Sequence, residues 1–187
     1  MKSGDYHGFF DFSPIIDRPP LKWPNGAHVA LWVVPNIEHY ELQVTGRKAD
    51  VRSLSHFEYG NRVGIWRLME TLTEYGIRGT VALNSAVCRH YPRVLEKALE
   101  LDWELMGHGI TNSQPNHELE LDDERRMIEQ AVAEIQRFQG KPPRGWLGPG
   151  LSETRDSLDL LRGAGIDYVC DWINDDQPYR MRNGLYS

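Results

Sequence analysis

Three titratable side chains of this sequence have types and positions that suit acid–base or metal-assisted chemistry. Glu38 follows an apolar run, and its carboxylate could act as a general base if burial raised its pKa toward neutrality. His108 follows another apolar run, and its imidazole could orient a water molecule, bind a metal or polarise a carbonyl group. Asp175 lies near the end of the chain, where its carboxylate could orient His108 or bind a substrate N–H group. We take these three residues as the candidate catalytic residues.

Each of these residues also has a purely structural interpretation. Glu38 could cap a loop or pair with an arginine such as Arg144, and His108 could hold its own loop together. Asp175 and the neighbouring Asp176 could cap a helix or lie in a solvated loop. At this point the sequence leaves both interpretations open.

The candidates follow short β-like segments that alternate with longer helical ones. The predicted strands are 28–34, 78–83, 103–106, 144–147 and 167–170, and the predicted helices are 61–75, 92–101, 120–138 and 157–163. Gly76 and Gly140 are placed to end two of these helices. Five βα-like units predict an α/β protein with a mostly parallel sheet or a (β/α) barrel.

Chemistry in parallel α/β folds collects where the chain leaves the carboxyl ends of the strands. Polar, titratable or glycine residues follow every predicted strand, as a shared pocket on one face would require. Two tryptophans flank the last two strands and could stack on a flat substrate ring, although core packing explains them equally well. The candidate substrate-binding residues are Asn36, Asn84, Thr111, Asn112, Trp146, Gly148, Gly150, Trp172 and Asp176.

Composition narrows the classes of function. The 187 residues carry 21 Lys+Arg against 27 Asp+Glu, a formal net charge of −6, so nucleic acid and anionic membranes are poor partners. The sequence shows neither a membrane-spanning apolar run nor the apolar region of a secretory signal. We therefore expect a cytoplasmic protein that binds a small uncharged or cationic substrate.

Four segments in a fixed order resemble one known family. PNIEHYE, LMGHGITNS, RGWLGPG and DWINDDQPY are similar to motifs of the polysaccharide deacetylase superfamily, and most similar to its allantoinase-like and cyclic-imide-type branch. The resemblance covers residues 15–179. It implies a distorted (β/α) barrel of about seven strands, here with about five βα units. It also implies hydrolysis of C–N bonds in acetamido groups or, in that branch, in small cyclic amides and ureides.

The resemblance also raises the question of a metal. Deacetylases of the family hold a divalent metal with one Asp and the two histidines of a His-Ser/Thr-x-x-His motif, and here the second histidine is replaced by Asn112. Glu38 and His108 remain as tentative metal ligands, with His39 as a candidate third ligand. Since catalytic zinc takes three protein ligands, we expect either no cofactor or one divalent metal such as zinc.

The late Leu-x-His motif of the family, which carries a catalytic histidine, has no counterpart after Asp176. We treat residues 1–187 as a single catalytic domain that is either complete or incomplete at its C-terminal end. An open sheet would expose strand edges, so we expect a homo-oligomer or a partner chain that completes the barrel.

Together these features predict a hydrolase of non-peptide C–N bonds that acts on a small amide, imide or ureide. Its oxyanion donors would be Thr111, Asn112 and the backbone around 148–150. A metal-dependent deacetylase of an N-acetylated sugar is one alternative. A non-catalytic binding or assembly subunit is the other, because two of the family's histidines are missing.

Overall fold

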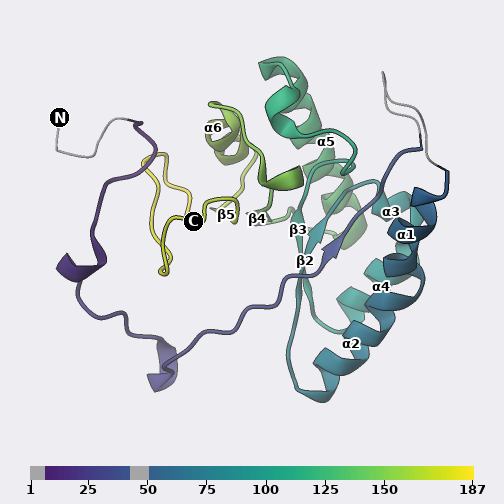
Figure 1. Ribbon diagram of the computed structural model, residues 1–187, viewed down its shortest axis with the longest axis horizontal. Helices are drawn as coiled ribbons and strands as arrows, with labels where there is room; N and C mark the ends of the chain where they lie inside the picture. The colour runs from purple at the N-terminus through teal and green to yellow at the C-terminus, as the bar shows by residue number, and fades with distance from the viewer. Residues whose placement is uncertain (1–6, 43–50) are drawn as a thin grey trace.

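A parallel sheet of five strands forms the centre of the molecule (Figure 1). The computed structural model describes residues 7–42 and 51–187. The strands are β1 (Asn36–Ile37), β2 (Thr80–Leu83), β3 (Glu104–Gly107), β4 (Gly145–Trp146) and β5 (Tyr168–Val169). They lie side by side in chain order, and every neighbouring pair is parallel. A doubly wound sheet reverses its strand order, whereas sequential order is that of a (β/α) barrel wall, so the predicted α/β class is confirmed.

The helices lie between the strands, as the alternation predicts. They are α1 (Ser53–Tyr59), α2 (Ile65–Glu74), α3 (Val87–His90), α4 (Pro92–Glu100), α5 (Leu121–Gln139) and α6 (Ser157–Gly163). A π-helical turn, Gly60–Gly64, joins α1 to α2, so this helical stretch begins earlier than the predicted residue 61. Gly76 has a φ of 66° directly after α2, which explains why a glycine ends this helix.

The first predicted strand is wrong over most of its length. Residues 28–32 are exposed, and pairing with β2 begins only at Val33, whose carbonyl oxygen accepts the Thr80 N–H at 3.0 Å. The carbonyl groups of Pro35 and Ile37 continue this ladder to Ala82 and Asn84. Since β2 starts at Thr80, the residues before Val33 extend past the end of the sheet (Figure 1), where the Trp32 indole N–H still donates to Thr80 Oγ1 at 2.8 Å.

Strand register determines which side chains share a face of the sheet. Asn36 is paired with Ala82, and Ala82 with Met106. Side chains alternate between the two faces of a strand, so these three residues lie on one face while Val81, Leu83 and Leu105 lie on the other. The second face packs on α2, α4 and α5 in the larger hydrophobic core, which includes Ile65, Met69, Leu72, Val94, Leu95 and Ile135.

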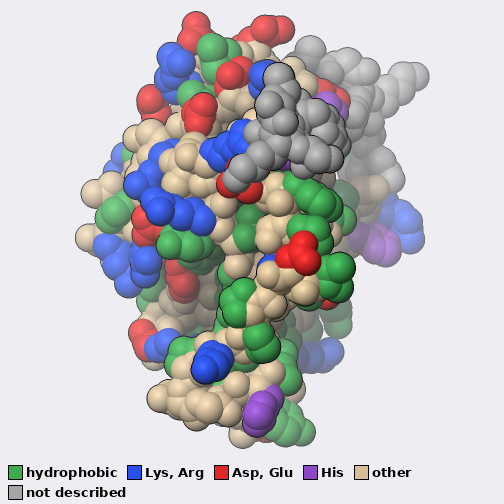
Figure 2. Space-filling view, turned by 90° about the vertical axis from the view of Figure 1, so that its left-hand side faces the viewer, with side chains coloured by type: hydrophobic (Ala, Val, Ile, Leu, Met, Phe, Trp, Pro, Cys, Tyr) green, Lys and Arg blue, Asp and Glu red, His purple; other side chains and the backbone are tan. Residues whose placement is uncertain are grey.

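Exposed charges of opposite sign are interspersed on the face shown in Figure 2, with hydrophobic side chains between them. Ion pairs among the described residues include Arg182 with Asp11 at 2.6 Å and Arg144 with Asp167 at 2.9 Å. Exposed pairs of this kind each contribute about 0–1 kcal/mol to stability. Within residues 7–42 and 51–187, no helix is both long enough and apolar enough to cross a membrane.

We expect Gly107→Ala to destabilise the fold, because a Cβ atom there would collide with the Trp146 ring. Overpacking of this kind costs about 1–3 kcal/mol in free energy of unfolding, which urea denaturation measures. Gly163→Ala at the end of α6 is the control, since nothing lies within 4 Å of its Cβ position. Equal stability of the two variants would contradict this account of the β3–β4 contact.

Candidate active site

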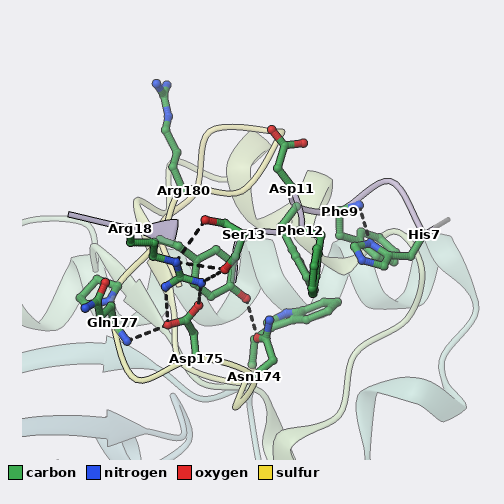
Figure 3. Close-up of a pocket in the computed structure, with 14 residues that line it drawn as sticks. His7, Phe9, Asp11, Phe12, Ser13, Arg18, Asn174, Asp175, Gln177 and Arg180 are labelled. Carbon is green, nitrogen blue, oxygen red and sulfur yellow. Dashed lines mark hydrogen bonds and ion pairs between the residues drawn. The ribbon is translucent and has the colours of Figure 1, made fainter. Parts of the chain in front are cut away.

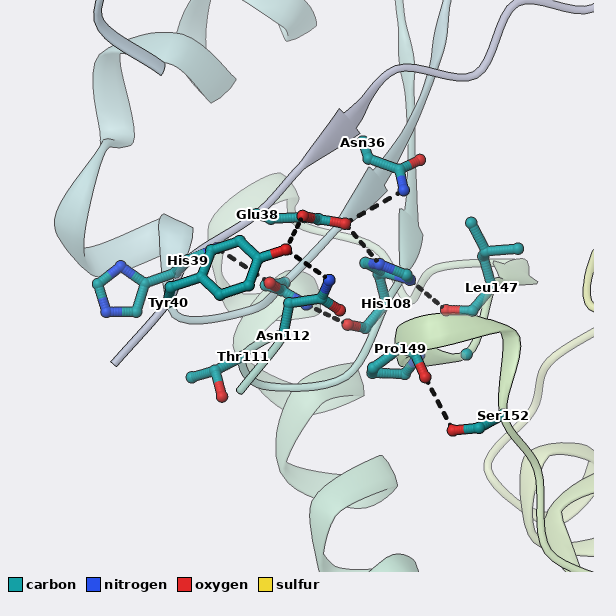
Figure 4. A network of polar contacts seen from close by, with 12 residues as sticks. Asn36, Glu38, His39, Tyr40, His108, Thr111, Asn112, Leu147, Pro149 and Ser152 are labelled. Carbon is teal, nitrogen blue, oxygen red and sulfur yellow. Dashed lines mark hydrogen bonds and ion pairs between the residues drawn. The ribbon is translucent and has the colours of Figure 1, made fainter. Parts of the chain in front are cut away.

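Glu38 and His108 meet at the carboxyl edge of the sheet because of the strand register. Asn36, Ala82 and Met106 are aligned across β1, β2 and β3. Two positions later, these three strands reach Glu38, Asn84 and His108, which therefore lie on the same face. Glu38 Oε1 lies 3.3 Å from His108 Nε2 (Figure 4). The structure thus brings together two of the three candidate catalytic residues.

His108 is held from both sides of its ring. The side chain is almost fully buried, and Nδ1 lies 2.6 Å from the carbonyl oxygen of Leu147. A carbonyl oxygen and a carboxylate oxygen can only accept, so both contacts are hydrogen bonds when each ring nitrogen carries a hydrogen. The buried amide of Asn84 donates to the His108 carbonyl oxygen and accepts the His39 N–H at 2.9 Å. Asn84 therefore ties the loops after β1, β2 and β3 together.

The Glu38 carboxylate is surrounded by hydrogen-bond donors. Tyr40 Oη donates to Oε2 at 2.7 Å, and Asn36 Nδ2 donates to Oε1 at 3.2 Å. Hydrogen bonding to His108, and then to Tyr40 and Asn36, holds the pKa of Glu38 below its usual value despite the opposing effect of burial. The expectation that the pKa of Glu38 is raised toward neutrality is therefore wrong, because the donors favour the charged form and outweigh the effect of burial.

The residues around this pair do not fit a three-ligand metal centre. His39 lies on the opposite side of the chain from Glu38, with its ring stacked on that of His90 at a centroid distance of 4.2 Å. Burial and His90 lower the pKa of His39. Asn112 directs its Nδ2 donor to Tyr40 Oη at 3.0 Å. Among the described residues, no group of three His, Cys, Asp or Glu side chains could hold a metal ion.

Asp175 lies in a different environment, against the N-terminal segment (Figure 3). Its two carboxylate oxygens accept hydrogen bonds from Arg18 at 2.8 and 2.6 Å. This pairing lowers the pKa of Asp175. The pair borders a cleft of about 840 Å³ whose aromatic residues include Phe10, Trp172 and Tyr179. The part of the chain that the structure describes shows no contact between Asp175 and His108, and Asp176 is exposed.

The remaining candidates divide into packing, loop and cleft residues. Trp146 is fully buried and lies across Gly107 on the helix-covered face, so it packs in the core and cannot stack on a substrate. Gly148 donates its N–H to Asp171 Oδ1 at 2.7 Å, which leaves that group unavailable to an oxyanion. Gly150 has a φ of 65° and open space around its Cα atom. Thr111 Oγ1 accepts the Ser113 N–H at 3.4 Å.

Sequence reasoning missed Tyr40 and Glu153. The signal for Tyr40 was present, because residues 36, 38 and 40 of an extended chain point to the same side. Glu153 has no such signal, since only the fold brings it to Asp171. Glu153 Oε2 accepts a hydrogen bond from Trp172 Nε1 at 3.1 Å. The other carboxyl oxygens, Glu153 Oε1 and Asp171 Oδ2, are buried without a partner among the described groups.

Burial of two adjacent carboxyl groups disfavours their ionisation. It raises the pKa of Glu153 to about 8 and also raises the pKa of Asp171, although the Gly148 N–H opposes the second shift. Two like charges at close range cannot both form cheaply in a buried site. Burial and the neighbouring Asp171 therefore favour the protonated form of Glu153.

Comparison with known proteins identifies the family. The polysaccharide deacetylase family model matches residues 47–169, which is more than half of the chain. The chain belongs to the polysaccharide deacetylase family. A comparison with curated proteins finds no match.

Solved structures share the fold of this polysaccharide deacetylase domain. PuuE allantoinase has a TM-score of 0.77 and 23% identity, with 90% of this chain and 62% of that chain covered. A polysaccharide deacetylase homologue from Mycobacterium smegmatis has a TM-score of 0.76 and 21% identity, covering 90% and 61%. A CE4 family pseudoenzyme from Bacillus anthracis has a TM-score of 0.57 and 14% identity, covering 74% and 41%. The domain thus spans less than two-thirds of the length of these proteins.

The family part of the resemblance is confirmed, and membership supports a C–N hydrolase of the deacetylase type. The pseudoenzyme shows that this fold also occurs without activity.

We expect Glu153→Gln to flatten the pH dependence of stability. The neutral carboxyl group of Glu153 contributes stability that is fully present below the unfolded pKa of about 4.5 and is lost as pH rises through about 8. A glutamine does not ionise, so the variant should exceed the wild type by about 1–3 kcal/mol in free energy of unfolding at pH 9. Urea denaturation at pH 5, 7 and 9 measures this difference.

Glu129→Gln on the exposed side of α5 is the control for this series, and it should follow the wild type at each pH. A parallel pH dependence of Glu153→Gln and wild type would show that Glu153 is not protonated in the folded protein.

Proposed function

We propose that this chain is the catalytic domain of a hydrolase that cleaves a non-peptide C–N bond in a small amide, imide or ureide. The observation that carries the proposal is the contact of Glu38 with buried His108 at the carboxyl edge of the sheet, in a member of the polysaccharide deacetylase family. Active sites of barrel enzymes lie at this edge.

Glu38 would act first as a base and then as an acid. It takes a proton from water while the water oxygen bonds to the substrate carbonyl carbon, which leaves a negative charge on the carbonyl oxygen. The C–N bond then breaks, and the same proton passes from Glu38 to the leaving nitrogen. His108 orients the carboxylate, and Thr111 or Asn112 could donate to the oxyanion.

The lowered pKa of Glu38 favours an activated substrate. A weakly basic carboxylate removes a proton from water less readily, but once protonated it is a strong acid toward the leaving nitrogen. The carbonyl groups of an imide and the acyl carbonyl group of a ureide are more electrophilic than that of a simple acetamide, because their nitrogen shares its lone pair with a second carbonyl group. This argument supports a small cyclic imide or ureide over an N-acetylated sugar, whose deacetylation in this family relies on a metal.

The second candidate is a non-catalytic binding or assembly subunit. Asn112 in place of a histidine favours it, because a site that has lost a metal ligand can also have lost its chemistry. The completion of the barrel by a second copy or another chain stays a prediction, which light scattering of the purified protein measures.

We expect Glu38→Gln to lower kcat/KM by at least about 100-fold, since general acid–base catalysis contributes about 10²–10⁴-fold. The assay follows ring opening of hydantoin, a cyclic imide and allantoin, and acetate release from N-acetylglucosamine, each with and without chelator. Glu96→Gln is the control, because Glu96 pairs with Arg93 on the surface of α4. Activity that survives Glu38→Gln would refute the assignment of the base, and activity that depends on added zinc would support the sugar deacetylase instead.

A further inference from the structure

The Tyr40 hydroxyl connects two motifs that lie far apart in the sequence. It donates to Glu38 Oε2 at 2.7 Å and accepts from Asn112 Nδ2 at 3.0 Å (Figure 4). Glu38 then presents its other oxygen, Oε1, to His108 at 3.3 Å. The loop after β1 and the loop after β3 are thus joined through a continuous chain of side-chain hydrogen bonds.

The direction of these hydrogen bonds follows from the donor inventory. A phenol has one hydrogen to donate, and a carboxylate can only accept. Because the Asn112 amide nitrogen donates to Tyr40 Oη, the Tyr40 hydrogen is free to point at Glu38. Hydrogen bonds to a charged acceptor are the stronger kind, so this contact constrains the rotation of the carboxylate.

Tyr40 is itself held in place by packing. Its ring stacks on Phe57 of α1 at a centroid distance of 3.7 Å and an interplanar angle of 14°. The Asn112 backbone N–H donates to the His39 carbonyl oxygen at 2.9 Å, which fixes the two loops beside each other. The hydroxyl therefore has one well-defined position, between an amide and a carboxylate.

We propose that Tyr40 is a positioning residue that, together with Asn112, holds Glu38 against His108 without a metal ion. This inference rests on the proposed role of Glu38. Asn112 stands where the metal-dependent pattern has its second histidine, and its N–H group serves the hydrogen-bond chain instead of a metal. Tyr40 engages the carboxylate oxygen that does not face His108. The site around Glu38 therefore does not fit a metal centre, because Tyr40 and Asn112 form hydrogen bonds where a metal centre would need ligands.

The first test is Tyr40→Phe, with kcat and KM measured separately on the best substrate of the series. We expect kcat to fall at least tenfold with KM changed less than twofold, because the substrate still binds while the carboxylate is no longer held. Asn112→Asp is the near-isosteric second variant, since its carboxylate competes for the Tyr40 hydrogen, and it should show the same split. Unchanged kcat in both variants would overturn the proposal.

The second test needs no turnover. In protein labelled with ¹⁵N at histidine, the ring signals of His108 should move in Tyr40→Phe and remain in place in Tyr186→Phe, an exposed tyrosine at the other end of the sheet. Identical His108 spectra of Tyr40→Phe and wild type would contradict the role of Tyr40. The activity of Glu38→Gln tests only the proposed function, whereas the His108 spectra test only the role of Tyr40. Failure of one proposal can therefore be told from failure of the other.

The third test asks whether the hydrogen-bond chain replaces a metal ligand. We expect the double variant Asn112→His, Tyr40→Phe to bind one equivalent of Co²⁺ with visible absorption, because it frees Glu38 and adds an imidazole. The control Gln136→His, Tyr40→Phe carries its new imidazole on the exposed side of α5 and should not bind. Stoichiometric Co²⁺ binding by the wild type, abolished by Glu38→Gln, would overturn the proposal.

Discussion

The contact between Glu38 and the buried ring of His108 depends on the register of three adjacent parallel strands. Because Asn36, Ala82 and Met106 are aligned, the residues that leave the sheet two positions later converge on one face. A slip of one residue in β1 would turn Glu38 to the helix side and bring Ile37 into the site. The apolar side chain of Ile37 therefore helps to position the carboxylate, since its burial against the core excludes that slip.

Buried polar groups beside this contact bind one another across the loops that follow the strands. Asn84 spans two loops with its amide, and the backbone of Leu147 accepts from the histidine ring. The neighbouring network of Glu124 with Thr154 and Ser157 anchors the loop after β4 to α5. An unpaired buried polar group costs about 1–3 kcal/mol, so each partner constrains the position of the other. These hydrogen bonds tie the loops after β2, β3 and β4 to their neighbours.

Several site predictions failed or stayed open for reasons that lie outside local sequence. Trp146 lies within the motif RGWLGPG, yet the strand register places its ring against Gly107 in the core. Asp175 pairs with Arg18, which is 157 positions away, and no local pattern indicates such a partner. The raised pKa of Glu153 likewise depends first on burial and then on Asp171, and both arise only when the loops after β4 and β5 pack together.

The sequence by itself determined the alternation of strands and helices, the bounds of α6 to the residue, the family and the position of Glu38 and His108 directly after two of the strands. Those features are encoded locally, in apolar periodicity, helix-ending glycines and short motifs. Only the tertiary structure decided where the first strand begins to pair, on which side His39 lies and which donors surround Glu38. Strand pairing, the side to which a side chain points and the protonation of a titratable group all depend on residues that are distant in sequence. The reason is that hydrogen bonds and burial act between residues that are close in space.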